Sequence, residues 1–282
     1  MSSSVRRLAS TDGVQVALHH LGGTGDHLLI CHATGFHGRA YEPFARRLAE
    51  HFTVWAVDMR GHGATDPPES GDFSWRGMAR DVQTCIDEIG APVFAFGHSM
   101  GGAAIVLTEL ARPGSIRAAY LFEPIILPDS VEIASNDNSM SAAARRRRAE
   151  FDSREDVLAR YGSRPPLGLL EPDALRAYVA HGFVDTEQGT VRLACEPEHE
   201  ARTFEAPDKP RVADLEGLNI PLMVAAGLVD GEMSPAHFAL ATAARGEGAI
   251  LVRHDDIFHF GPLENPDLIA SDLINWLRSP QI

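Results

Sequence analysis

The chain carries a serine at the centre of the segment Pro92-Val93-Phe94-Ala95-Phe96-Gly97-His98-Ser99-Met100-Gly101-Gly102. The apolar run 93–96 is long enough for a buried strand, and a helix-compatible run, 103–111, follows the turn. The turn matches the pattern G-x-S-x-G, which requires a strand before it and a helix after it. The alternative is a tight glycine turn in which the serine has no catalytic role, but the flanking strand and helix favour a nucleophile.

Each residue type in this turn has a physical role. Gly97 and Gly101 lack a Cβ, so the strand and the helix can pass each other closely. A turn this sharp holds Ser99 in a strained backbone conformation. Its Oγ then stands clear at the carboxyl end of the sheet, beside the amino end of the helix. Because that helix end carries unpaired N–H groups and partial positive charge, it suits an oxyanion.

Strand and helix patterns alternate on both sides of this turn. We expect further strands at 5–9, 14–20, 27–31, 53–57, 116–122, 220–226 and 249–253, and helices at 39–51, 74–89, 235–244 and 266–278. Such alternation implies an α/β fold with a mostly parallel, doubly wound sheet. It ceases between Glu123 and about Val212, where two helices are expected at 141–161 and 172–183. We therefore predict a core domain of residues 1–123 and 212–282, and a helical cap (lid) of residues 124–211.

The composition is typical of a soluble globular protein, with 44% hydrophobic and 23% charged residues. A net charge of −14 disfavours nucleic acid and anionic membranes as main partners, because both need a basic face. A short basic run, Arg145–Arg148, is interpreted as the solvated face of a lid helix, with attraction of an acidic substrate as the alternative.

The cellular setting is inferred from the cysteines and the apolar runs. The three cysteines are widely spaced without a C-x-x-C pair, which is typical of reduced thiols. Residues 1–10 contain no apolar signal region, and no run approaches the ~18 apolar residues of a membrane span. We expect a cytoplasmic protein that acts on a small molecule. The oligomeric state, a homo-oligomer included, is left open.

A serine nucleophile needs an adjacent base, and the base needs an orienting acid. In this topology the acid and then the histidine follow the serine in the chain, at the ends of later strands. Asp230 follows the strand at 220–226, and His259 follows the last strand. We predict Ser99, Asp230 and His259 as the catalytic residues. Glu123, which ends the strand at 116–122, is the alternative acid; failing that, we expect it to orient the lid or to bind near the base.

Backbone N–H groups must also face the developing oxyanion. One donor is Met100, the residue after the nucleophile, and the other comes from the loop after the third strand. We predict Phe36 as the second donor, with Thr34 and Ala33 as alternatives. Pocket candidates are His37, Glu123 and Phe183, together with the apolar lid residues Phe151, Tyr161, Leu167, Leu169 and Leu170.

The sequence does not favour metal chemistry. His199-Glu200 begins like the zinc motif H-E-x-x-H, but Thr203 stands where the second histidine is required. No cluster of cysteine and histidine has the spacing of a zinc site. We therefore expect no metal.

Together these motifs resemble the α/β-hydrolase superfamily over residues 5–122 and 212–278. The segments that carry the resemblance are Gly97–Gly102, His32 to Phe36, Asp58–Gly63, Gly227–Asp230, and His259-Phe260 with Glu264-Asn265-Pro266. The resemblance implies an eight-stranded sheet, a helical cap inserted after strand six, a covalent acyl-enzyme and no cofactor. Many relatives have His-Gly directly in the oxyanion loop, whereas Ala33 and Thr34 intervene here.

A fold shared by many enzymes cannot name the substrate. Serine at the centre of the G-x-S-x-G turn disfavours the haloalkane dehalogenase and epoxide hydrolase branches, which resemble this chain but use aspartate at that position. We expect a serine hydrolase, with its catalytic triad and oxyanion hole, acting on a small or medium carboxylic ester or lactone. The alternatives are a carbon–carbon bond hydrolase of vinylogous keto acids and a ligand-binding receptor on the same fold.

Overall fold

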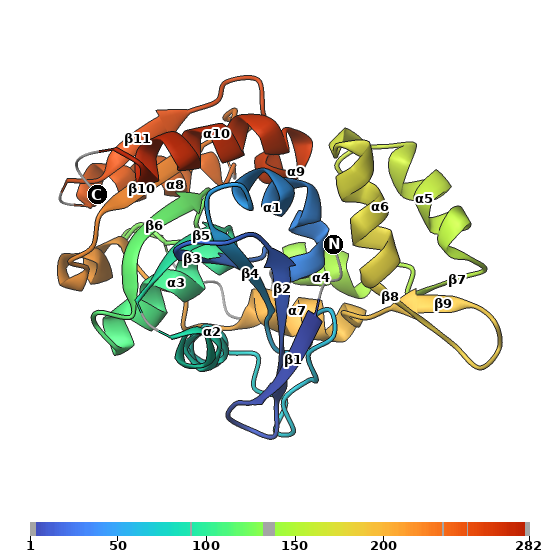
Figure 1. The fold of residues 1–282 in the computed structure, drawn as a ribbon. Coiled ribbons are helices and arrows are strands. Elements are labelled where there is room, and N and C mark those ends of the chain that lie inside the picture. Colours follow the sequence, from blue (N-terminus) through green and yellow to red (C-terminus); the bar gives the residue numbers. More distant parts are fainter. Residues whose placement is uncertain (1–3, 91, 132–138, 233, 247, 280–282) are drawn as a thin grey trace.

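A sheet of eight strands runs through the molecule (Figure 1). The computed structural model describes residues 4–90, 92–131, 139–232, 234–246 and 248–279. In spatial order the strands are β1 (Ser4–Ala9), β2 (Gln15–Gly22), β4 (Thr53–Asp58), β3 (His27–Cys31), β5 (Val93–His98), β6 (Ile116–Phe122), β10 (Leu222–Ala226) and β11 (Ile250–Arg253). The pairs β1–β2 and β2–β4 are antiparallel, and the other pairs are parallel. The mostly parallel, eight-stranded sheet is confirmed.

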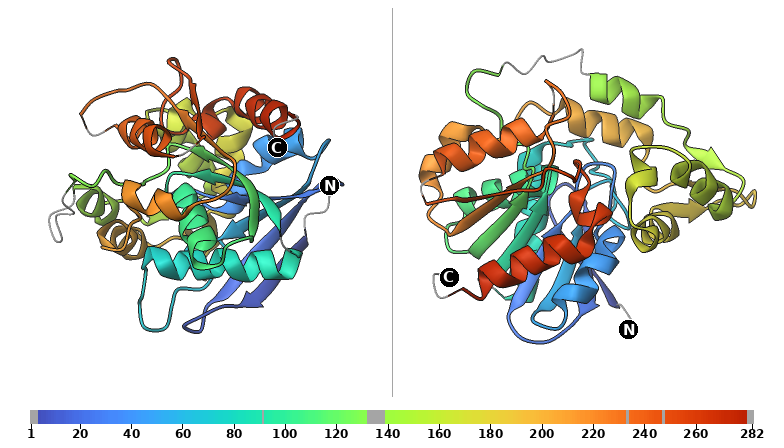
Figure 2. Two further views of the ribbon diagram at one scale, coloured as in Figure 1. Left: turned by 90° about the vertical axis from the view of Figure 1, so that its left-hand side faces the viewer. Right: turned by 90° about the horizontal axis from the view of Figure 1, so that it is seen from above.

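Helices cover both faces of this sheet (Figure 2). On one face lie α1 (Glu42–Leu48) and α10 (Pro266–Leu277), and on the other lie α2 (Trp75–Ile89), α3 (Met100–Ala111) and α8 (Ala236–Arg245). Successive side chains of a strand point to opposite faces, so Phe94 and Phe96 of β5 enter the first core while Val93 and Ala95 enter the second. Burial on both sides explains why β5 reads as a continuous apolar run.

Several helix ends follow from local sequence. The Ser74 side chain accepts the N–H of Gly77 at 3.1 Å and starts α2, and Gly90, at φ 97°, ends it. The expected helix at 39–51 is a 3₁₀ turn, η1 (Gly38–Tyr41), followed by α1. None of the helices in the described ranges combines the length and apolarity that a membrane crossing requires.

Residues 124–211 leave the sheet after β6 and return to it before β10, and we call them the insert. Residues 132–138 of the insert lie outside the described part of the chain. The insert contains α4 (Ser139–Arg145), β7 (Glu150–Phe151), α5 (Arg154–Gly162), η2 (Leu167–Leu169), α6 (Pro172–His181), β8 (Phe183–Asp185), β9 (Val191–Leu193) and α7 (Pro197–Glu205).

The sequence predicted a helical insert, but the insert also contains strands. The expected helix at 141–161 is two helices, α4 and α5, with β7 between them. The second expected helix ends at His181, and Phe183 begins β8. Strands β7, β9 and β8 form a small antiparallel sheet. Strands of two or three residues are too short to show an alternating pattern, which explains why the sequence did not reveal them.

The topology gathers several loops at one edge of the large sheet. Carboxyl ends of parallel strands share an edge, and β5 lies between β3 and β6. The chain order of the strands reverses on passing from β3 to β5, and ligand sites of α/β sheets form at such a point. The loops after β3, β5 and β6 therefore meet there.

Candidate active site

Ser99 has the strained backbone that its motif predicts. Its φ is 55° and its ψ is −116°, a region that residues other than glycine rarely adopt. Its N–H donates to the carbonyl of Phe122 at 3.0 Å, and its own carbonyl accepts the N–H of Ile125 at 3.2 Å. A Cβ on Gly101 would lie 2.1 Å from the carbonyl oxygen of Cys31, so only glycine fits there. The turn that carries Ser99 is thus held between β6 and α3.

Glu123 is the carboxylate that meets His259. Its Oε2 lies 2.6 Å from Nδ1 of His259, and its Oε1 accepts the N–H of Gly227 at 2.7 Å. Glu123 is 1% exposed, so its charge is held by these two partners away from water. Like Ser99, it has a positive φ, of 43°. Because Nδ1 faces the carboxylate, Nε2 is the ring nitrogen left for chemistry in the pocket.

Asp230 is not brought to this site, which corrects the acid predicted from chain order. The loop after β10 is tied to the histidine loop through the backbone, where the N–H of Leu228 donates to the carbonyl of Ile257 at 2.7 Å. The side chain of Asp230 is exposed beyond that bond. Within the ranges that the structure describes, it has no hydrogen bond or ion pair. Glu123, the alternative acid, occupies the position instead.

His98 links the histidine loop to the loop after β3. Its Nε2 lies 2.7 Å from the carbonyl of His259 and its Nδ1 lies 2.7 Å from the hydroxyl of Tyr41. Burial, and then the neighbouring His259, lower the pKa of His98 well below its usual range, so the ring is neutral. A carbonyl only accepts, so Nε2 carries the proton and Nδ1 accepts from Tyr41. Tyr41 in turn accepts the N–H of Ala33 at 3.2 Å.

The loop after β3 offers a different oxyanion donor from the one predicted. The N–H of Phe36 donates to the carbonyl of Ala33 at 3.1 Å, which closes a turn and engages that donor. The hydroxyl of Thr34 lies 3.4 Å from the sulfur of Met100, so Thr34 adjoins the residue after the nucleophile. In the described part of the chain, the N–H groups of Thr34 and Met100 have no acceptor. These two N–H groups are therefore the available candidates for an oxyanion donor, and Phe36 contributes its ring to the pocket.

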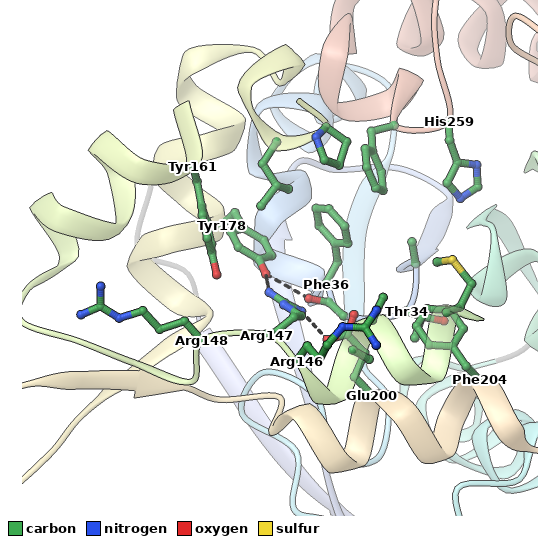
Figure 3. A pocket seen from close by; sticks show the side chains of 18 of the residues that line it. Thr34, Phe36, Arg146, Arg147, Arg148, Tyr161, Tyr178, Glu200, Phe204 and His259 are labelled. Atoms are coloured by element: carbon green, nitrogen blue, oxygen red, sulfur yellow. Dashed lines mark hydrogen bonds and ion pairs between the residues drawn. The ribbon is translucent and has the colours of Figure 1, made fainter. Parts of the chain in front are cut away.

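A pocket of about 510 Å³ opens over Ser99 and His259 and extends to the insert (Figure 3). The ring of Phe36 lines it and packs against Phe260 and Tyr178, with centroids 5.0 and 4.9 Å apart. A volume of this size suits a small-molecule substrate. Of the apolar candidates from the insert, Phe151, Tyr161 and Leu167 line the pocket, whereas Leu169, Leu170 and Phe183 do not.

His37 and Phe183 are structural neighbours of the pocket and not part of its lining. His37 is buried, and its Nε2 lies 3.1 Å from the carbonyl of Tyr178. Burial lowers the pKa of His37 to about 4, so its ring is neutral at physiological pH. Phe183 packs edge-on against Phe151, with centroids 5.8 Å apart, inside the insert.

The arginine run at 145–148 is divided between two surroundings. Arg145 pairs with Glu198 and Glu205 of α7 and does not line the pocket. The next three arginines do line it, which the interpretation as a solvated lid face did not anticipate. Figure 3 shows Arg147 bound to Tyr178 and Glu200, with Arg148 on the side of the pocket away from His259.

The chain is similar to known hydrolases. A sequence model described as "Alpha/beta hydrolase family" matches residues 28–272. Human "Monoglyceride lipase" is 35% identical over 106 residues, 36% of this chain and 35% of that protein. "2-(acetamidomethylene)succinate hydrolase" of Mesorhizobium japonicum is 27% identical over 175 residues, 61% of this chain and 60% of that protein. The chain thus matches only about a third to three-fifths of the length of these relatives.

The fold has close counterparts among solved structures. "Crystal Structure of E-2-(Acetamidomethylene)succinate Hydrolase" superimposes with a TM-score of 0.80 and 21% identity, and covers 99% of this chain and 100% of that one. At this level of identity the likeness concerns the fold.

Proposed function

Since the chain belongs to the alpha/beta hydrolase family, we propose that it is a serine hydrolase that cleaves a small or medium carboxylic ester or lactone through an acyl-enzyme on Ser99. The observation that carries the proposal is the ion pair between the buried Glu123 and His259, because His259 lines the same pocket as Ser99. A strained serine, a histidine and a buried carboxylate at one sheet edge are the parts that acyl transfer needs.

The proton path follows from the tautomer. Glu123 accepts the Nδ1 proton of His259, so Nε2 takes the proton from Ser99 as its Oγ attacks the carbonyl carbon. The imidazolium then forms beside the carboxylate, which stabilises it. Nε2 returns the proton to the leaving alcohol. In the second half-reaction Nε2 takes a proton from water as the water oxygen attacks the acyl carbon. The bond to Oγ of Ser99 then breaks, the acid leaves, and Nε2 returns the proton to Oγ.

The negative oxygen of each tetrahedral intermediate needs donors that are already in place. We assign the N–H groups of Thr34 and Met100 to this role, because neither has another acceptor among the described residues. Removing one such donor costs about 3–4 kcal/mol in enzymes where it was measured. The insert acts in this proposal as a cap that covers the pocket and sets the shape of the substrate.

The names of the relatives support ester or related acyl chemistry without fixing a substrate. The human relative is a lipase by name, and the bacterial relative is a hydrolase of a substituted succinate by name. Because the chain matches only part of each, neither substrate is transferred. The cysteines Cys31, Cys85 and Cys195 are free and buried, which supports a cytoplasmic location.

A fluorophosphonate probe tests the proposal directly. We expect it to label the protein, and the labelled peptide to contain Ser99. Wild-type protein should also turn over p-nitrophenyl butyrate, and Ser99→Ala should abolish both labelling and turnover. Labelling that survives in Ser99→Ala would contradict the assignment.

A carbon–carbon bond hydrolase of vinylogous keto acids is the second candidate, because the pocket holds arginines that suit the carboxylate of such an acid. Turnover confined to coloured dienoic keto acids, with no hydrolysis of p-nitrophenyl esters, would favour it. Binding without rapid turnover of either class would favour a receptor.

A further inference from the structure

The pocket has far more positive than negative side chains. Its described lining contains Arg146, Arg147, Arg148, Arg160 and Arg164, against a single acidic side chain, Glu200. The chain as a whole has the opposite balance, with 39 acidic and 25 basic residues. Composition therefore does not account for this concentration of arginine, which lies on the insert above Ser99.

Two of the five guanidinium groups already have partners. Arg147 pairs with Glu200 and donates to the hydroxyl of Tyr178 at 3.0 Å. Arg148 lies over the ring of Phe151, 4.5 Å from its centroid, and donates to the carbonyl of Glu150 at 2.7 Å. These arginines hold the wall of the pocket together.

The other three guanidinium groups are those of Arg146, Arg160 and Arg164. No described residue forms an ion pair or a hydrogen bond with any of them. Elsewhere on the insert, Arg145, Arg154, Arg176 and Arg192 each pair with a carboxylate. All three side chains are exposed to solvent where they line the cavity, so they are accessible to a ligand, and a bound anion would neutralise part of their charge.

We propose that the substrate is an anion whose carboxylate, separated from the scissile carbonyl by a short apolar chain, is bound by Arg146, Arg160 and Arg164. This inference rests on the proposed function and specifies its substrate class. The planar fork of a guanidinium matches the two oxygens of a carboxylate. The same pocket is also lined by Phe36, Leu167 and Phe260, which supply an apolar wall for the connecting chain.

Paired substrates isolate the terminal charge. The mono(4-nitrophenyl) esters of glutarate, adipate and pimelate are each compared with the methyl-capped diester of the same acid. Both members release 4-nitrophenol and differ only in the charge at the far end. We expect kcat/KM to favour the anionic member of at least one pair by about tenfold or more, since a hydrogen bond to a charged group is worth that much.

Substitution of the three arginines should remove this preference. In Arg146→Gln/Arg160→Gln/Arg164→Gln we expect the ratio of anionic to neutral kcat/KM to fall to about one, through a higher KM for the anion. Arg176→Gln removes an insert arginine that pairs with Asp173 outside the pocket, and should leave the ratio unchanged. The three single variants, each losing part of the ratio, replace the triple variant should it unfold.

Binding to Ser99→Ala separates this inference from the proposed function. We expect calorimetry to show binding of adipate that the triple substitution abolishes, and weaker binding of inorganic phosphate. Binding of adipate by a protein that cleaves no ester would support the anion site and overturn the proposed function. Ester cleavage without preference for any anionic member would overturn the anion site alone. Tighter binding of phosphate than of adipate would overturn the choice of carboxylate.

Discussion

Oε2 of Glu123 lies 2.6 Å from Nδ1 of His259, which stands 136 positions later in the chain. Glu123 directly follows β6, the neighbour of β5 in the sheet, so it emerges beside the serine elbow. His259 follows β11 at the edge of the sheet, and its loop returns across the end of β10. There the N–H of Leu228 donates to the carbonyl of Ile257 in this loop, and the N–H of Gly227 donates to Glu123. The acid thus sits one strand from the nucleophile.

The first prediction concerns this pair. Glu123→Gln keeps the shape of the side chain but removes its charge, so the histidine loses the group that fixes its tautomer and stabilises the imidazolium. We expect kcat for p-nitrophenyl butyrate to fall by about 10³- to 10⁴-fold, as in triads where the acid was neutralised. Asp230→Asn, the matched control on the exposed side chain, should retain kcat within about twofold, because Asp230 has no hydrogen bond or ion pair with His259. A larger loss of kcat in Asp230→Asn than in Glu123→Gln would contradict the assignment of Glu123 as the acid.

The second prediction concerns the oxyanion donors. Replacing the peptide N–H of residue 34 by an ester oxygen, through incorporation of the α-hydroxy acid, removes one donor without changing a side chain. We expect kcat to fall by about 10²- to 10³-fold with little change in KM. The same replacement at residue 36 removes a turn hydrogen bond, and should lower kcat much less. A larger loss at 36 than at 34 would restore Phe36 as the donor.

The third prediction concerns the hydrogen bonds from Ala33 through Tyr41 and His98 to the carbonyl of His259. Tyr41→Phe removes the hydroxyl that joins the two loops, and leaves His98 without its donor. Because Tyr41 acts only by positioning, we expect kcat to fall by about tenfold while the fluorophosphonate still labels Ser99. Tyr120→Phe is the control, since the buried hydroxyl of Tyr120 has no hydrogen-bond partner in the described ranges. Equal losses of kcat in both variants would mean that Tyr41 contributes only to the stability of the fold.

The fourth prediction concerns stability at low pH. Asp58 is buried and accepts N–H groups from Gly38 and Ala64 at 2.6 and 2.8 Å, and from Nε2 of His19 at 2.9 Å. Burial alone would raise the pKa of Asp58, but attraction to His19, the hydrogen bond with His19 and the nearby His37 and His32 together outweigh it and hold the pKa well below the usual range. A carboxyl with a lowered pKa stabilises the fold above its unfolded pKa of about 4, and this stability is lost as the pH falls.

Asp58→Asn tests this linkage. We expect the variant to be less stable than wild type at pH 7, and the free energy of unfolding to depend less on pH between pH 5 and 3. The difference in slope should approach, at most, about 1.4 kcal/mol per pH unit. Urea denaturation at several pH values measures it. Asp87→Asn, at an exposed ion pair with Arg112, should leave both quantities nearly unchanged. Parallel curves for wild type and Asp58→Asn would contradict the assignment.

Local sequence was sufficient for the elements around Ser99. Residues 93–96 are apolar because β5 is buried on both faces, and the glycines at 97 and 101 are required by contacts closer than any Cβ allows. Both features are set by neighbours in sequence and by the geometry of one turn. For the same reason β6 has the predicted bounds, and α2, α3, α8 and α10 differ from prediction only at their ends.

The choice among equivalent groups was made by distant parts of the chain. Glu123 and Asp230 both follow a strand of the same sheet, and only the return path of the loop after β11 brings one of them to His259. Thr34 and Phe36 carry identical N–H groups, and a turn hydrogen bond to Ala33 leaves the first one available. Residue type and spacing specify which chemistry a segment can supply. Which of two like groups reaches the reacting atoms depends on packing and hydrogen bonds between loops far apart in the sequence, and those exist only in the folded chain.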